Sequence, residues 1–234
     1  MLFVHEYHWV KGRQELDFEA AFRDLWMPML GKEDDARLLY YCHHTHGTGP
    51  AYGVLTLTAV KDGAAWERLV TRMQRGDLAQ HVADLDEMRH RVDQKTIIPV
   101  TWAPMQEIDF AAVPTTPQQH EPTIFMEDTG WPHAPLADYI RFWDEGYYQP
   151  MEKRPRSERL LDIQMVFQPA YGAGRRKEAI LWQKVLDHDR LLNLLLHESD
   201  PELLKPGAFM HEALQFRDTW ESRLLRTASW SPLH

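Results

Sequence analysis

The sequence has almost no cysteine and no long hydrophobic run. Its 234 residues include one cysteine, Cys42, which cannot form a disulfide within the chain and indicates a reducing compartment. No apolar run approaches the roughly 20 residues that cross a bilayer, and the longest one, Leu191 to Leu196, contains Asn193. The opening residues lack a basic stretch and a small-residue cleavage site, so they indicate a strand and not a signal peptide. We therefore expect a soluble, cytoplasmic protein that does not insert into a membrane.

Positive charge is also in short supply. The chain carries 26 Lys and Arg residues against 35 Asp and Glu residues, which gives a net charge of −9. A protein that binds nucleic acid normally has an excess of Lys and Arg, so this class is disfavoured. Nine Trp, nine Phe and eight Tyr residues supply enough apolar surface to exclude an intrinsically disordered chain.

The chain contains an internal repeat, with an offset between 122 and 130 residues. Four local matches occur in the same order in both halves, which is hard to obtain by chance. The matches pair Pro28-Met29 with Pro150-Met151, Gly47-Thr48-Gly49 with Gly172-Ala173-Gly174, His81 with His211, and Trp102-Ala103-Pro104 with Trp230-Ser231-Pro232.

A proline-rich segment separates the two halves. Residues 106–122 contain Pro114, Pro117 and Pro122, a spacing that disfavours helices and central strands, and we interpret this segment as an extended linker. The expected modules are residues 1–105 and 123–234. In each module the hydrophobic periodicity predicts the order strand, helix, strand, strand, helix, strand.

This βαββαβ order is that of the ferredoxin-like motif, and it predicts an α+β fold. Two such modules can pair their sheets in a fused, dimeric-type α+β barrel made by one chain. The alternative is two separate ferredoxin-like units on a tether. We favour the fused barrel, because an isolated unit would leave one apolar sheet face bare.

The sequence resembles the NIPSNAP-type modules of the dimeric α+β barrel superfamily. The resemblance depends on Lys11-Gly12 after the first strand, a proline near the end of the first helix, a β-hairpin, and final strands that lead into Trp102-Ala103-Pro104-Met105 and Trp230-Ser231-Pro232-Leu233. It implies a fold shared with cofactor-free monooxygenases, polyketide cyclases, chlorite dismutases and haem-degrading enzymes. It implies no catalytic residue, and no motif in the sequence indicates a haem ligand.

The most unusual local feature is the histidine-rich run from Tyr40 to His46. Alternate residues of a strand share a face, so His44 and His46 are expected on one side and Tyr41 on the other. His5 and Tyr7 share one face of the first strand. A histidine can move a proton near neutral pH, and a nearby tyrosine can stabilise a developing oxyanion.

Three interpretations of this cluster stay open. The histidines can be structural groups at a strand end, a proton-transfer site, or ligands of a metal ion or haem. The metal interpretation is the weakest, because the third strand should separate the first strand from the second, and ligands would have to reach across about 9–10 Å of sheet.

A second group of candidates follows the first strand of the second half. Glu127, Asp128 and His133 could form an acid–base group, although Asp128 could equally be a turn or capping residue. Among the aromatic residues, Trp26, Trp102 and Tyr40 are candidates for contacts with a planar substrate.

These observations predict a cofactor-independent enzyme that uses His and Tyr acid–base chemistry on a small hydrophobic molecule, aromatic or polyketide-like. Its reaction would be that of a lyase, isomerase or cyclase, in a pocket between the helices and the sheet of one module. The alternatives are a cofactor-free monooxygenase of the same fold, a non-catalytic NIPSNAP-like binding or scaffold protein, and a haem- or metal-binding member. We expect no cofactor, and a homo-oligomer is left open.

Overall fold

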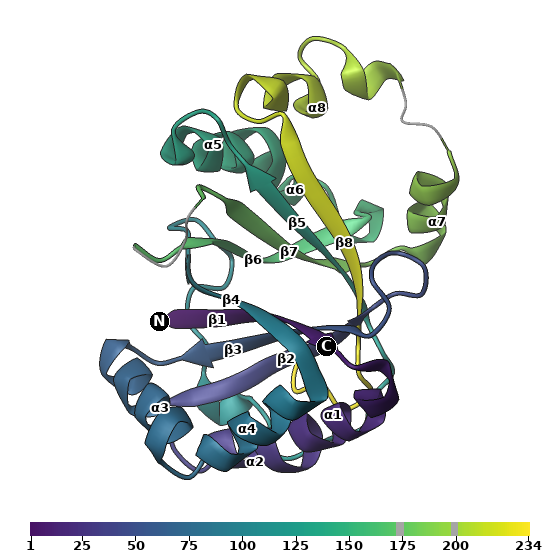
Figure 1. The fold of residues 1–234 in the computed structure, drawn as a ribbon. Coiled ribbons are helices and arrows are strands. Elements are labelled where there is room, and N and C mark those ends of the chain that lie inside the picture. Colours follow the sequence, from purple (N-terminus) through teal and green to yellow (C-terminus); the bar gives the residue numbers. More distant parts are fainter. Residues whose placement is uncertain (172–175, 198–200) are drawn as a thin grey trace. The chain divides into compact units, whose positions relative to one another are not determined.

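The computed structural model describes residues 1–171, 176–197 and 201–234 (Figure 1). The chain divides into two compact units. The first unit contains residues 1–98, 107–124 and 224–234, and the second contains residues 99–106 and 125–223. Residues 107–122 of the expected linker therefore belong to the first unit. The predicted turn at Gly172-Ala173-Gly174 lies outside the described residues.

The first unit is built on the antiparallel strands β1 (Leu2–Val10), β2 (Ala36–His44), β3 (Gly53–Val60) and β4 (Arg89–Pro99). Strand β3 lies between β1 and β2, and the end of β8 (Thr219–Thr227) pairs with β2. The helices are η1 (Gly12–Gln14), α1 (Glu15–Ala21), η2 (Phe22–Trp26), α2 (Met27–Leu30), α3 (Gly63–Arg75), α4 (Ala79–Met88) and η3 (Phe110–Ala112).

The second unit repeats this order around β5 (Ile124–Trp131), β6 (Leu161–Pro169) and β7 (Ala179–Val185). Strand β7 lies between β5 and β6, and β8 follows on the other side of β5. Its helices are α5 (Leu136–Trp143), η4 (Asp144–Tyr148), α6 (Gln149–Glu152), η5 (Arg156–Glu158), α7 (His188–Leu196), η6 (Pro201–Leu204), α8 (Phe209–Glu212) and η7 (Ala213–Gln215).

Both units therefore have the predicted βαββαβ order. The first helix of each unit contains a five-residue π-helical turn, η2 or η4, and these turns begin at Phe22 and Asp144, 122 residues apart. Pro28 and Pro150 follow two residues after the last residue of each turn. The offset of the helices is thus the one that the sequence indicated for the prolines.

Two predicted elements differ from the structure. The spacing of Ala213, Phe216, Trp220 and Leu224 predicts a helix, but the helix ends at Gln215 and β8 takes up residues 219–227. Pairing with β5 and β2 gives this segment its backbone hydrogen bonds in the extended form, which overrides the helical spacing. Likewise, the spacing of Val82, Leu85, Met88 and Val92 predicts a helix that reaches Val92, but α4 ends at Met88 because residues 89–99 form β4 beside β1.

The segment after β8 completes the core of the first unit. Trp230 is buried, its ring centre lies 4.9 Å from that of Tyr41, and its indole nitrogen donates to Glu19 at 2.8 Å. The Ser231 hydroxyl accepts a hydrogen bond from the backbone of Tyr41 at 3.1 Å. Helices of the first half and residues at the end of the second half therefore share one hydrophobic core.

The matching segment after β4 packs in the second unit. The backbone nitrogen of Val100 donates to Val166 at 3.0 Å, and the ring of Trp102 stacks on Tyr148 at 5.3 Å. Val100 and Ala103 belong to the apolar cluster of this unit. The segment at the end of the second half thus completes the core of the first unit, and the segment at the end of the first half completes the core of the second unit.

In the described part of the chain, no helix combines the length and the hydropathy needed to cross a bilayer.

Replacement of Trp230 by alanine tests the role of this final segment. Trp230 is fully buried and hydrogen-bonded, so Trp230→Ala should lower the free energy of unfolding by about 3–5 kcal/mol. Trp220→Ala is the matched control, because Trp220 is 43% exposed and should cost less than about 1 kcal/mol. Urea denaturation measures both values, and equal losses would contradict the proposed role of the segment.

Candidate functional site

The two faces of the first unit's sheet carry different groups. Val4, Val54 and Tyr41 belong to the core cluster that packs against the helices. Because side chains alternate along a strand, Tyr7 and His44 lie on the opposite face, turned away from the helices. The structure therefore separates Tyr41 from His44, as the alternation predicted. It also places His44 away from the helix-facing side, where we expected the pocket.

Tyr7 and His44, two of the predicted catalytic residues, are in direct contact in this unit. The imidazole Nε2 lies 2.9 Å from the Tyr7 hydroxyl, and the two ring centres are 5.5 Å apart. Tyr7 is buried and His44 is partly exposed. The pair can therefore connect a buried phenol to an imidazole within reach of solvent.

Two glycines allow this pair to form. A Cβ atom on Gly53 would lie 2.0 Å from the Tyr7 hydroxyl oxygen, and one on Gly49 would lie 2.3 Å from Nδ1 of His44. Any other residue at either position would displace the phenol or the imidazole. Gly49 and Gly53 thus leave the space that the Tyr7 and His44 side chains occupy.

The other predicted histidines lie elsewhere. His46 follows the end of β2 in an exposed turn, so it does not share a strand face with His44. His5 is buried on the same face of β1 as Tyr7, two residues away.

Tyr41 belongs to a group of residues beside α1. His43 Nε2 lies 3.2 Å from Glu19 Oε2, and Trp230 donates to the other oxygen of the same carboxylate. The hydrogen bond from His43 is the main cause that lowers the pKa of Glu19. Burial, reinforced by the nearby Glu19 charge, raises the pKa of Tyr41 well above its usual value. Tyr41 is therefore a poor proton donor at neutral pH.

Sequence reasoning missed a second polar group on the helix-facing side. His8 is buried, with Nε2 3.0 Å from Thr56 Oγ1 and Nδ1 2.7 Å from the guanidinium of Arg89. Burial and the Arg89 charge lower the pKa of His8 well below its usual value, and burial raises the pKa of Glu6. Arg89 is 81 residues from His8, so no local spacing could have indicated the contact.

In the second unit the candidate acids point in different directions. Glu127 is buried and forms an ion pair with Arg223 at 3.3 Å. Asp128, the next residue of β5, lies on the opposite, helix-facing side of the sheet. His133 follows the end of β5, where its Nε2 lies 3.2 Å from the backbone oxygen of Gln215. These three residues therefore do not form one acid–base group.

Asp128 instead belongs to a chain of hydrogen bonds that crosses from sheet to helix. The amide of Gln183, on β7, donates to Asp128 Oδ2 at 2.7 Å, and the Tyr147 hydroxyl, on η4, donates to Gln183 at 2.9 Å. Burial raises the pKa of Asp128 to about 6, although the nearby Ser222 hydroxyl and the hydrogen bond from Gln183 partly offset this effect. Asp128 can thus gain or lose a proton near neutral pH.

The predicted substrate-contacting aromatics do not belong to one unit. Trp26 is buried in the core of the first unit, 5.9 Å from the Phe22 ring centre. Tyr40 is buried on β2. Trp102 belongs to the second unit, against Tyr148.

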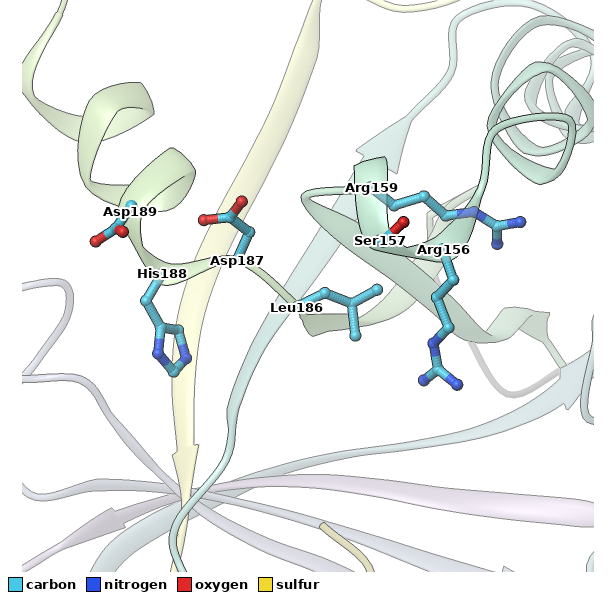
Figure 2. Close-up of a pocket in the computed structure, with 7 residues that line it drawn as sticks. All are labelled: Arg156, Ser157, Arg159, Leu186, Asp187, His188 and Asp189. Atoms are coloured by element: carbon cyan, nitrogen blue, oxygen red, sulfur yellow. The ribbon is translucent and has the colours of Figure 1, made fainter.

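An open groove of about 680 Å³ lies in the second unit between η5 and the start of α7 (Figure 2). Its acidic and basic side chains do not converge on one point in Figure 2. Arg156 pairs with Asp162 at 2.8 Å and Asp187 with Arg190 at 3.2 Å, so these charges are already matched. A groove of about 610 Å³ in the first unit likewise holds a bidentate pair, Arg68 with Asp35.

Neither groove contains a predicted site residue. In the described ranges, no group of three or more His, Cys, Asp or Glu side chains is arranged to hold a metal ion.

Comparison with known proteins identifies the fold. A proposed monooxygenase from Lactobacillus acidophilus NCFM is 10% identical, with a TM-score of 0.55 over 99% of this chain and 97% of its own. An anthrone oxidase-like protein is 9% identical, with a TM-score of 0.58 over 97% of this chain and 91% of its own. An uncharacterized NIPSNAP domain protein from Burkholderia xenovorans, 15% identical, matches 44% of this chain and 99% of its own with a TM-score of 0.36.

No family model and no curated protein matches the sequence. The whole-chain matches confirm the predicted fold class, the fused dimeric-type α+β barrel of two ferredoxin-like modules.

Replacement of Asp128 tests the environment of its carboxyl group. Its pKa is higher in the folded protein than in the unfolded chain, so the stability it contributes is complete below about pH 4 and is lost as the pH rises through about 6. From pH 4 to pH 7 the wild type should therefore lose up to about 3 kcal/mol relative to Asp128→Asn.

Urea denaturation at both pH values gives this difference. Asp138→Asn is the control, because Asp138 forms an exposed ion pair with Arg141 and its removal should leave the pH dependence close to that of the wild type. An Asp128→Asn profile parallel to the wild-type profile would show that the carboxyl group is not perturbed.

Proposed function

We propose that the protein is a cofactor-independent acid–base enzyme that acts on a small hydrophobic, aromatic or polyketide-like molecule. The observation that carries this proposal is the contact between Tyr7 and His44, at 2.9 Å. A phenol and an imidazole at this distance can pass a proton between them. The fold supports an enzyme of this kind, since solved structures that match the whole chain include a proposed monooxygenase and an anthrone oxidase-like protein.

The two residues have different tasks in this mechanism. With the imidazole proton on Nδ1, Nε2 of His44 accepts the hydrogen bond from the Tyr7 hydroxyl. The Tyr7 oxygen then takes a proton from the substrate while its own proton passes to Nε2 of His44. Nδ1 of His44 is buried, so the imidazolium holds the transferred proton until this proton returns through Tyr7. One proton leaves the substrate, and no electron is transferred in this step.

The deprotonated substrate can follow either of two routes. In the first, the proton returns at another atom, which completes an isomerase, lyase or cyclase reaction. In the second, the carbanion or enolate gives electrons to molecular oxygen, and one oxygen atom enters the product while the other leaves as water. Both routes need the same proton abstraction, so the Tyr7–His44 pair serves either of them.

A reducing, cytoplasmic location fits this proposal. The single cysteine, Cys42, is buried on β2, and the chain forms its core without a disulfide. Fractionation of cells that produce the protein would test the location.

Anthrone is a suitable probe, because its carbonyl group acidifies a benzylic CH₂ group. Without oxygen, in D₂O, the enzyme should accelerate exchange of deuterium into that position. With oxygen, conversion to anthraquinone and water would show the second route, and exchange without oxidation would show the first.

Two substitutions and one control complete the test. Tyr7→Phe and His44→Gln should each lower the enzyme-dependent exchange rate about 10²–10⁴-fold. His43→Gln, on the other face of β2, should retain most of the rate. No acceleration by the wild type, or equal rates in all variants, would overturn the proposal.

A further inference from the structure

The first strands of the two modules carry an acidic residue at the same place. Glu6 and Asp128 are 122 residues apart, the separation found for the π-helical turns η2 and η4. Both side chains lie on the helix-facing side of their sheet, and burial raises the pKa of both. The surroundings of the two acids can therefore be compared directly.

In the first unit the groups around Glu6 form a closed network. Thr56 donates to Glu6 at 3.4 Å, and His8 lies between Thr56 and Arg89. Arg89 also forms an ion pair with Asp86. The positive charge of Arg89 thus has a partner within the protein, and we interpret this network as structural.

The corresponding region of the second unit contains a buried cation that lacks such a partner. Arg217 is 5% exposed, and its guanidinium lies 5.1 Å from the ring centre of Trp220. Among the described residues, its Nε has no hydrogen-bond partner and no carboxylate lies within ion-pair distance. A buried guanidinium without an anion is costly, so this arrangement favours the binding of one.

The groups around Arg217 suit an aromatic anion. The charge of Arg217 acts on the carboxyl group of Asp128 and on the hydroxyl group of Tyr139, so these groups lie near one another. The Tyr139 ring centre lies 4.7 Å from that of Trp143 and 6.3 Å from that of Phe216. Aromatic side chains therefore accompany the cation.

One oxygen of Asp128 accepts no well-aligned hydrogen bond, although the Ser222 hydroxyl lies near the carboxyl group. Gln183 donates to Oδ2, whereas Oδ1 is buried with no donor in hydrogen-bonding geometry in the described ranges. Because Oδ2 already accepts a hydrogen bond, a proton on the carboxyl group belongs on Oδ1. In that form Oδ1 can donate to a bound oxygen.

We propose that the helix-facing side of the second unit binds a small aromatic carboxylate, which pairs with Arg217 and accepts a hydrogen bond from Asp128. The ring of the ligand would lie against Tyr139 and Phe216. This site shares no residue with the Tyr7–His44 pair and goes beyond the function proposed for that pair.

Binding at this site should be coupled to uptake of a proton. The charged or titratable groups near Asp128 are Arg217, Glu127, Tyr139 and Tyr147, and only Arg217 is a cation. A bound carboxylate would repel ionised Asp128, so the protonated form binds it. With a pKa of about 6, about half of Asp128 is protonated at pH 6 and about one hundredth at pH 8. Affinity should therefore fall about 50-fold between these pH values.

Isothermal titration calorimetry of the full chain with benzoate tests the site, because benzoate stays ionised over this range. We expect saturable binding at pH 6 that is about 50-fold weaker at pH 8. Benzamide, which has the same shape without the charge, should not bind. The absence of saturable benzoate binding at pH 6, or equal binding of benzamide, would overturn the proposal.

Three variants assign the contacts. Arg217→Gln should weaken benzoate binding about tenfold or more, whereas Arg141→Gln, which removes an exposed arginine from α5, should bind as the wild type does. Asp128→Asn should bind with the same affinity at both pH values. Wild-type binding by Arg217→Gln, or an unchanged pH dependence in Asp128→Asn, would contradict the proposal. If circular dichroism shows that Arg217→Gln does not fold, the Asp128→Asn measurement still decides.

Discussion

The indole of Trp230 connects several parts of the first unit through a single carboxylate. Its nitrogen donates a hydrogen bond to one carboxylate oxygen of Glu19 on α1. The other oxygen of Glu19 is hydrogen-bonded to His43 on β2. A helix, a strand and the segment after β8 thus meet at one ionised group. Because the Trp230 ring also covers the buried Tyr41, the apolar and polar contacts of this segment reinforce each other. The position of α1 over the sheet depends on this meeting point.

The two units use the same framework for different local chemistry. In the first, the helix-facing side is filled by an aromatic cluster and by the His8–Arg89 network, whose polar groups are matched. In the second, the chain from Tyr147 through Gln183 to Asp128 holds one carboxylate oxygen and leaves the other without a donor. An internal repeat relaxes the demand on each copy, since the same position in the two modules can have different polar neighbours. The difference lies in a few side chains, and the backbone order is unchanged.

Sequence patterns predicted the parts of the structure that depend on local spacing. The alternation along β1 and β2 assigned Tyr41 and His44 to opposite faces, and the order of strands and helices gave the fold class. The bonds of Gln183 to Asp128 and of Arg89 to His8 join residues 55 and 81 positions apart, so they depend on strand register and could not be read from spacing. The segment from Ala213 to Leu224 shows the opposite failure. Its helical spacing is real, but sheet pairing decides the conformation of residues 219–227.

The π-helical turns in the first helix of each unit bear on the history of the chain. Such a turn adds one residue to an otherwise regular helix, and it is rare. Here it occurs twice, at the same offset of 122 residues and at the same distance before a proline. Independent insertion at matching places in both halves is a poor explanation. Duplication of one module that already contained the wide turn would place it at the same position in both halves, as observed.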